Sequence, residues 1–181
     1  GAFAIMRNMK NKVWWILLAV VVVLALYIWS AYNSLVGKNE AVTNQWAQVE
    51  TQYQRRFDLI PNLVESVKGI FNQEQAVFNA LAEARTRYSG AVTISDKAAA
   101  ATQVESALGR LLAVIENYPQ LKSAENVQTL MVQLEGTENR VSVERKRYND
   151  NVRDLNVAVK RFPTNIIAGL SISMKSTFVP I

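Results

Sequence analysis

"LVGKNEAVTNQWAQVETQYQRRFDLIPNLVESVKGI", residues 35–70, places an apolar side chain at every seventh position with a single exception. A repeat of seven residues indicates a helix that buries one face against other helices, because two helical turns contain about seven residues. The apolar members are Leu35, Val42, Val49, Leu63 and Ile70, and the exception is Arg56. The stretch therefore predicts a bundle helix with one charge in its apolar seam.

A second repeat of the same length lies near the C-terminal end of the chain. Its members are Val127, Leu134, Val141, Tyr148, Leu155 and Phe162. Two shorter amphipathic stretches lie between the two repeats, and no segment alternates apolar and polar residues for the length of a strand. We expect an all-α fold, an antiparallel up-and-down helix bundle with long first and last helices at about residues 34–69 and 123–161.

Pro61 allows two interpretations, because an interior proline either ends a helix or kinks it. The predicted first and last helices match in length only if the first helix continues past Pro61. This favours a kink. If the first and last helices pair antiparallel over their whole length, Pro61 lies near Gly136. The missing side chain of Gly136 could admit the bent backbone.

Arg56 needs a partner if it is buried in the seam. The same register places Glu138 at nearly the same height on the opposing helix, with Arg145 two turns further along. We expect Arg56, Glu138 and Arg145 to form a structural polar layer. Two alternatives stay open: Arg56 extends its guanidinium to the surface, or it binds a ligand.

Residues 13–37 carry no charge and begin "VWWILLAVVVVLALYIW", long enough to cross a bilayer as a helix. A cleaved signal peptide is the rival interpretation, but no small-residue cleavage motif follows. Arg7, Lys10 and Lys12 precede the span, which predicts a cytoplasmic N-terminus and an extracytoplasmic bundle. The predicted parts are a basic segment 1–12, a transmembrane helix 13–33, a bundle 34–162 and a C-terminal tail 163–181.

Composition narrows the possible chemistry. The chain has no cysteine and no histidine, so disulfides, thiolate nucleophiles and the commonest metal ligand and general base are missing. The seven glycines form no nucleotide-binding pattern. Apart from the three basic residues before the span, acidic and basic residues nearly balance, which does not favour nucleic-acid binding. We predict no catalytic residue, cofactor, metal site or small-molecule substrate.

Several long motifs follow one another in the order typical of one family. They are "YNSLVGKNEAVTNQWAQVETQYQRRFDLIPNLVESVKG", "LAEAR", "LLAVIENYP", "TENRVSVERKRYND" and "VAVKRFPTNIIAGL". The chain resembles the LemA family over nearly its whole length. The resemblance implies a single-span protein of a bacterial inner membrane with an antiparallel helix bundle, and one branch of this family includes magnetosome membrane proteins. The tail "SISMKSTFVPI" departs from the family pattern.

Three classes of function fit these features. The first is a membrane-anchored scaffold or adaptor, not an enzyme, whose bundle meets protein partners or forms a homo-oligomer. The second is a lipid-organising role, because the membrane-proximal basic residues Arg153, Lys160 and Arg161 precede "FPTNIIAGLSISM", which could lie in the bilayer interface. The third is an enzyme that uses carboxylates such as Asp58, Glu65, Glu138 or Glu144. The scaffold is the prediction.

Overall fold

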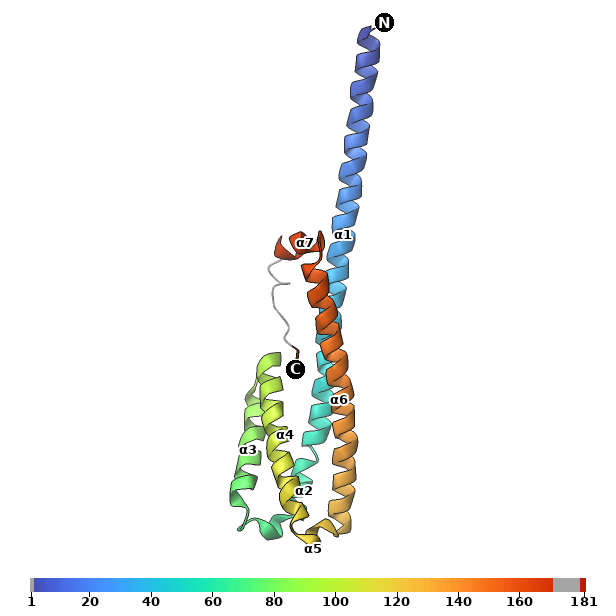
Figure 1. Cartoon of the computed structure of the whole chain (residues 1–181). Helices are drawn as coiled ribbons and strands as arrows, with labels where there is room; N and C mark the ends of the chain where they lie inside the picture. The colour runs from blue at the N-terminus through green and yellow to red at the C-terminus, as the bar shows by residue number, and fades with distance from the viewer. Residues whose placement is uncertain (1, 171–179) are drawn as a thin grey trace. The chain divides into compact units, whose positions relative to one another are not determined.

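The computed structural model describes residues 2–170, 180 and 181, and all regular secondary structure in these residues is helical (Figure 1). In chain order the elements are α1 (Ala2–Phe57), α2 (Ile60–Ser66), the 3-10 helix η1 (Lys68–Ile70), α3 (Gln75–Gly90), α4 (Ile94–Glu116), α5 (Pro119–Lys122), α6 (Glu125–Lys160) and α7 (Thr164–Leu170). The all-α prediction is confirmed. The described residues form two compact units. Unit 1 contains residues 2–41 and 153–170, and unit 2 contains residues 42–152 together with 180 and 181.

The N-terminal part of α1 is apolar and exposed. Its large apolar side chains from Val13 to Tyr32 are 43–72% exposed. α1 is long and apolar enough to cross a membrane, and α4 meets the same criteria. The apolar side chains of α4 are however part of the unit 2 core, whereas the large apolar side chains of α1 from Val13 to Tyr32 are all exposed. α1 therefore contains the candidate membrane span.

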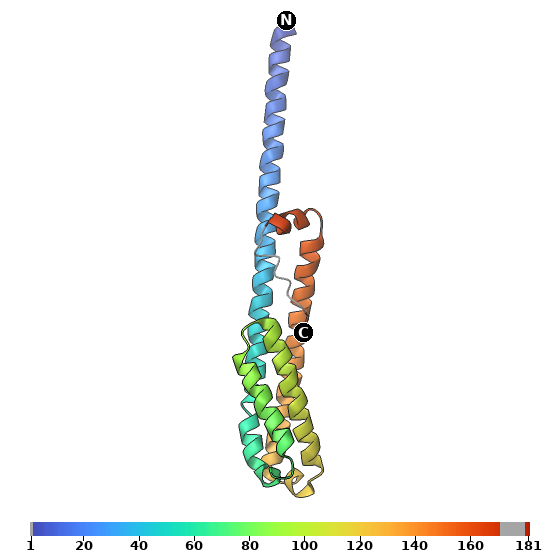
Figure 2. The same ribbon diagram turned by 90° about the vertical axis from the view of Figure 1, so that its left-hand side faces the viewer.

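The core of unit 2 is built from the two predicted repeats and the shorter helices between them. The buried repeat members are Val42, Val49, Leu63, Ile70, Val127, Leu134, Val141 and Tyr148. α4 contributes eight more buried side chains, and α3 lies beside α4 in both ribbon views (Figures 1 and 2). Burial of one face of each helix against its neighbours is what the seven-residue spacing predicts.

Aromatic rings join α1 to α3 and α6 inside unit 2. The Tyr53 and Phe57 rings stack at 5.5 Å between centroids, and Tyr88 of α3 meets Phe57 edge-on at 5.0 Å. About two turns before Tyr53 in α1, the Trp46 ring contacts Tyr148 of α6 edge-on at 5.6 Å. Offset and edge-on ring pairs of this kind each stabilise by about 0.5–1.5 kcal/mol beyond the area that they bury.

The chain does not pass Pro61 as one kinked helix, as the sequence suggested. α1 ends at Phe57, and Pro61 lies in the first turn of the separate helix α2, with Leu59 as the preceding cap residue. In a first turn a proline removes no hydrogen bond, because the backbone N–H there has no partner within the helix. The interior-proline penalty of about 3 kcal/mol therefore does not apply here.

Gly136 does not lie opposite the interruption between α1 and α2. Two contacts bracket Pro61 on α6: Arg56 with the Leu134 carbonyl, and Ser66 with Asn126. Pro61 lies between these levels, so it faces the 126–134 segment and not Gly136. A Cβ placed on Gly136 would meet no atom within 4 Å, which means that no backbone approaches it closely. The expected pairing of Pro61 with Gly136 is corrected accordingly, because the helices pair in a different register.

Unit 1 has a small core of its own. Leu35 of α1 is buried with Ile167 and Ala168 of α7, and the partly buried neighbours are Ala31, Ala158 and Val159. Ile167 therefore contacts the protein, while Ile166 is 56% exposed. Phe162, the last member of the second repeat, is 80% exposed because α6 ends at Lys160 and the chain turns away from the helical line. Residues 171–179 of the tail lie outside the described residues.

Candidate functional site

Arg56 is a buried charge in the last turn of α1, only 3% exposed. Its Nε donates to both carboxylate oxygens of Glu105 in α4, at 2.7 and 3.0 Å. Its Nη2 donates to the Glu138 carboxylate of α6 at 3.3 Å. One guanidinium thus connects three helices, and charge-assisted hydrogen bonds of this kind are roughly twice as strong as neutral ones.

The third nitrogen of Arg56 reaches the backbone of α6. Nη1 donates to the Leu134 carbonyl, and Thr137 Oγ1 lies 3.4 Å away. The Thr137 hydroxyl itself donates to the same carbonyl at 2.9 Å. The guanidinium and the Thr137 hydroxyl therefore share one backbone acceptor. Arg56 is therefore held in place by backbone as well as by carboxylates.

The two carboxylate partners of Arg56 differ in their exposure to solvent. The Glu105 side chain is 26% exposed and the Glu138 side chain is 67% exposed. The predicted contact between Arg56 and Glu138 is present, but it is longer and better solvated than the contact with Glu105. Because solvent weakens an ion pair, Glu105 is the partner that offsets most of the desolvation cost of Arg56.

Sequence reasoning did not find Glu105. One signal was available: Glu105 is the single acidic residue in the interior of α4, between Asp96 in the first turn and Glu116 at the end. It follows the buried Val104 and precedes the buried Leu108 by three residues. An isolated acid beside an apolar stripe is a candidate partner for an unpaired arginine on another helix.

Arg145, the third member of the predicted polar layer, lies near this site. It lines an open pocket of about 530 Å³ together with Glu105 and Glu138. Burial raises the pKa of the nearby Tyr53 above its ordinary value, while the positive charges of Arg145 and Arg56 act in the opposite direction. The structure thus brings Arg56, Glu138 and Arg145 into one region of unit 2 and adds Glu105 to it.

The LemA family model matches residues 45–179 of the chain. This chain belongs to the LemA family. The protein named Magnetosome protein MamQ 2 of Paramagnetospirillum magneticum is 25% identical over 163 residues, which cover 76% of this chain and 60% of that protein. Magnetosome protein MamQ of Magnetospirillum gryphiswaldense is 35% identical over 63 residues, 35% of this chain and 23% of that protein. The chain thus spans about 60% of the length of the first of these relatives.

The LemA match covers the whole polar layer. Arg56, Glu105, Glu138 and Arg145 all lie within residues 45–179, whereas the exposed apolar part of α1 precedes them. The region that resembles the family is therefore the one that contains the buried ion pair.

The carboxylates considered for catalysis are engaged in separate local contacts. Asp58 accepts from Gln54 Nε2 at 2.8 Å, and Glu65 pairs with Lys68 in the next helical turn. Glu144 accepts from Gln45 Nε2 at 2.6 Å and from Arg147 at 2.9 Å, and Glu138 contacts Arg56. The structure does not gather these four carboxylates around one pocket.

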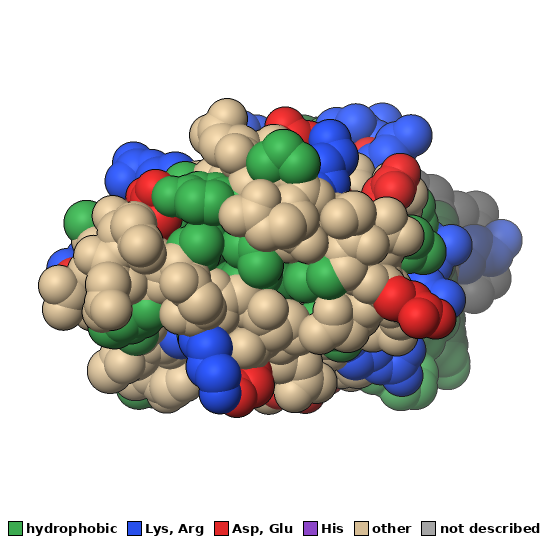
Figure 3. Space-filling model, turned by 90° about the horizontal axis from the view of Figure 1, so that it is seen from below, with side chains coloured by type: hydrophobic (Ala, Val, Ile, Leu, Met, Phe, Trp, Pro, Cys, Tyr) green, Lys and Arg blue, Asp and Glu red, His purple; other side chains and the backbone are tan. Residues whose placement is uncertain are grey.

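Charges of both signs lie close together at one end of unit 2. Figure 3 views the end that bears α5 and shows Lys and Arg side chains interspersed with Asp and Glu and with apolar side chains. Within the described part of the chain, no group of three or more Asp and Glu residues is arranged to hold a metal ion. On this face no single-sign surface is visible that would attract a nucleic acid.

The three basic residues predicted near the membrane belong to unit 1. Arg153 and Lys160 are exposed on α6, and Arg161 directly follows its last residue. Arg161 lines a second pocket, together with Lys38 of α1. Of the three basic residues, Arg161 is the one that lines this pocket.

Proposed function

We propose that this LemA-family chain is a single-span membrane protein, not an enzyme, whose helix bundle serves as a scaffold or adaptor. In this proposal residues 13–33 cross the bilayer and residues 34–162 form an antiparallel up-and-down bundle. The observation that carries it is the exposure of the apolar side chains of α1 from Val13 to Tyr32, 43–72% in each case. An uncharged helix with apolar side chains on all sides is stable in hydrocarbon and costly in water.

The outer face of α6 supports the scaffold role. Val132 and Val143 are 69% and 50% exposed, and their spacing of about three turns places them on one side of the helix. Gly136 lies between them on the same side, where an added Cβ would meet no atom within 4 Å. This side of α6, the α6 valine face, is the surface that we propose for protein partners or for a second copy of the chain. The relatives named as magnetosome proteins are consistent with a role in a membrane assembly.

Crosslinking through the α6 valine face tests the scaffold role, and the absence of native cysteine makes any introduced thiol unique. Gly136→Cys, treated with a thiol-reactive crosslinker in native membranes, is expected to yield adducts with another protein or with a second copy. Ser106→Cys on the exposed surface of α4 is the matched control and is expected to yield few. Mass spectrometry identifies the adducts. Equal crosslinking at both positions, or none at either despite full maleimide labelling, would contradict the proposal.

The orientation of the span has its own prediction. Arg7, Lys10 and Lys12 should remain in the cytoplasm, which places the bundle outside the inner membrane. Ser95→Cys, on the exposed start of α4, is then expected to react with a membrane-impermeant maleimide in intact cells whose outer membrane has been permeabilised. Asn8→Cys, before the span, should react only after the inner membrane is lysed. The reverse pattern would place the bundle in the cytoplasm and leave the anchor itself intact.

A further inference from the structure

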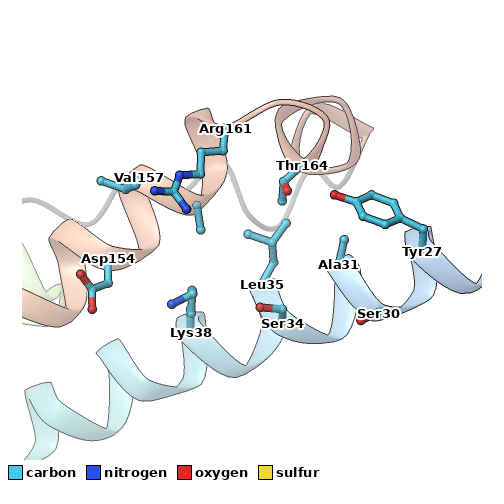
Figure 4. Close-up of a pocket in the computed structure, with 11 residues that line it drawn as sticks. Tyr27, Ser30, Ala31, Ser34, Leu35, Lys38, Asp154, Val157, Arg161 and Thr164 are labelled. Atoms are coloured by element: carbon cyan, nitrogen blue, oxygen red, sulfur yellow. The ribbon is translucent and has the colours of Figure 1, made fainter.

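Unit 1 contains an open pocket of about 560 Å³ (Figure 4). Helix α1 contributes one wall, and the end of α6 with the segment after it contributes the other. The lining residues of α1 that matter here are Tyr27, Ser34 and Lys38, and those of the opposite wall are Asp154, Arg161 and Thr164. Of these residues, the sequence pointed to Arg161 alone, as a membrane-proximal basic residue.

The pocket lies where α1 changes from an uncharged to a charged helix. Tyr27 belongs to the uncharged stretch 13–37, and Lys38 is the first charged residue after it. Tyr27, Ser34 and Lys38 follow one another at intervals of about one or two turns, so they lie on one side of α1. If the uncharged stretch spans a bilayer, the Lys38 end of the pocket lies at the level of the lipid headgroups.

Two cations share this pocket with one carboxylate. In Figure 4 the side chains of Lys38 and Arg161 extend from opposite walls into the space between the helices, with Asp154 beside them. Among the described residues, neither Lys38 nor Arg161 forms a side-chain ion pair. Asp154 offsets one of the two positive charges, which leaves one in excess. A phosphodiester carries one negative charge and matches this excess.

We propose that this pocket binds the phosphate of an anionic phospholipid. Arg161 presents the planar fork that suits phosphate oxygens, and Lys38 adds a second positive charge from the facing helix. The hydroxyl groups of Ser34 and Thr164 line the same space and can donate to the remaining oxygens. Basic pockets beside membrane helices are a common means of recognising acidic headgroups.

A lipid fits this pocket better than free phosphate does, because the lining continues as apolar surface. Ala31, Leu35, Val157 and Ala158 line the space between the charged and hydroxyl groups. Beyond Tyr27 the exposed apolar side chains of α1 continue towards the N-terminus, for example Leu24 at 55%. A headgroup at Lys38 and Arg161 therefore places its acyl chains along α1. Free phosphate would leave this apolar lining without a partner.

This inference rests on the proposed membrane span, so the test first establishes insertion. The full-length chain is expressed in membranes, and resistance to alkaline extraction confirms that it is embedded. It is then purified in mild detergent, and native mass spectrometry records the lipids that stay bound. The added probes are phosphatidylglycerol, the zwitterionic phosphatidylcholine, and inorganic phosphate as competitor. We expect one phosphatidylglycerol to be retained, at a concentration about tenfold lower than phosphatidylcholine requires.

Three variants, each of which removes one positive charge, test whether the lipid binds in this pocket. Lys38→Gln and Arg161→Gln are each expected to raise the phosphatidylglycerol concentration needed for half-occupancy about tenfold. Lys160→Gln removes the same charge from an exposed neighbour outside the pocket and should change it less than twofold. Equal losses in all three variants would mean unspecific attraction and would overturn the site. Displacement of the lipid by millimolar inorganic phosphate would assign the pocket to free phosphate and overturn the lipid proposal.

The insertion step separates the two possible failures. A chain that is extracted from the membrane by alkali contradicts the proposed span. A chain that resists extraction but retains both lipids equally contradicts only the phosphate site, and the anchored scaffold is unaffected. Each variant is checked by the same extraction, so a loss of lipid binding is attributed to the pocket only where insertion is unchanged.

Discussion

Glu105→Ala is expected to lower the free energy of unfolding of this chain by about 3 kcal/mol, which is at the lower end of the cost of breaking a buried ion pair. The Arg56 guanidinium is 3% exposed and would lose its contacts at 2.7 and 3.0 Å. It would retain the better solvated Glu138, the Leu134 carbonyl and the long contact with the Thr137 hydroxyl. Chemical denaturation in mild detergent, followed by circular dichroism, measures the effect.

Glu138→Ala is the matched control for this prediction. The Glu138 side chain is 67% exposed and lies 3.3 Å from Arg56, so its removal should cost about 1 kcal/mol or less. This revises the sequence-based view that Glu138 is the buried partner. A cost for Glu138→Ala equal to or above that of Glu105→Ala would contradict the assignment of Glu105 as the main partner.

A double replacement distinguishes a structural role of the pair from a functional one. Arg56→Met combined with Glu105→Leu removes both charges and fills similar volumes, so much of the lost stability should return. If crosslinking through Gly136→Cys is also retained in this background, the pair serves the fold alone. If stability returns but crosslinking does not, the charges determine the arrangement of helices that the partner recognises.

Tyr148→Ala is expected to be the other large effect, at about 3–5 kcal/mol. Tyr148 has no exposed surface and packs edge-on against Trp46 at 5.6 Å between ring centroids. Truncation to alanine removes this contact and leaves a cavity between α1 and α6 that the rigid helices fill only partly. The same denaturation experiment measures the loss.

Tyr148→Phe separates the ring from its hydroxyl. The Tyr148 hydroxyl is buried without a hydrogen-bond partner among the described residues, which costs free energy in the folded state. Replacement by phenylalanine keeps the ring and should be neutral or stabilising by about 1 kcal/mol. Val143→Ala, an exposed change on the same helix, should stay within about 0.5 kcal/mol. A large loss in Tyr148→Phe would mean that the hydroxyl has a partner in the folded chain.

The seven-residue repeats predicted the part of the unit 2 core that α1 and α6 contribute at those positions, because a position that recurs every two turns stays on one face of a helix. Val42, Val49, Leu134 and Val141 are all buried as expected. Phe162 is not, since the repeat continues in the sequence past the residue where α6 ends. Periodicity identifies a face but does not determine where the helix stops.

The sequence by itself determined the helical class, the exposed apolar segment of α1 and the need of Arg56 for a partner. Each of these follows from the local order of side chains: their spacing, their lack of charge, or one charge within an apolar line. Only the tertiary structure decided that Glu105 is the main partner and that Pro61 begins a new helix instead of bending an old one. It also placed Lys38 and Arg161 on facing walls of one pocket. These three features depend on the register between helices and on which helices become neighbours. Many registers would bury the same helix faces, so the local sequence does not select one. The packing of the whole core makes that selection.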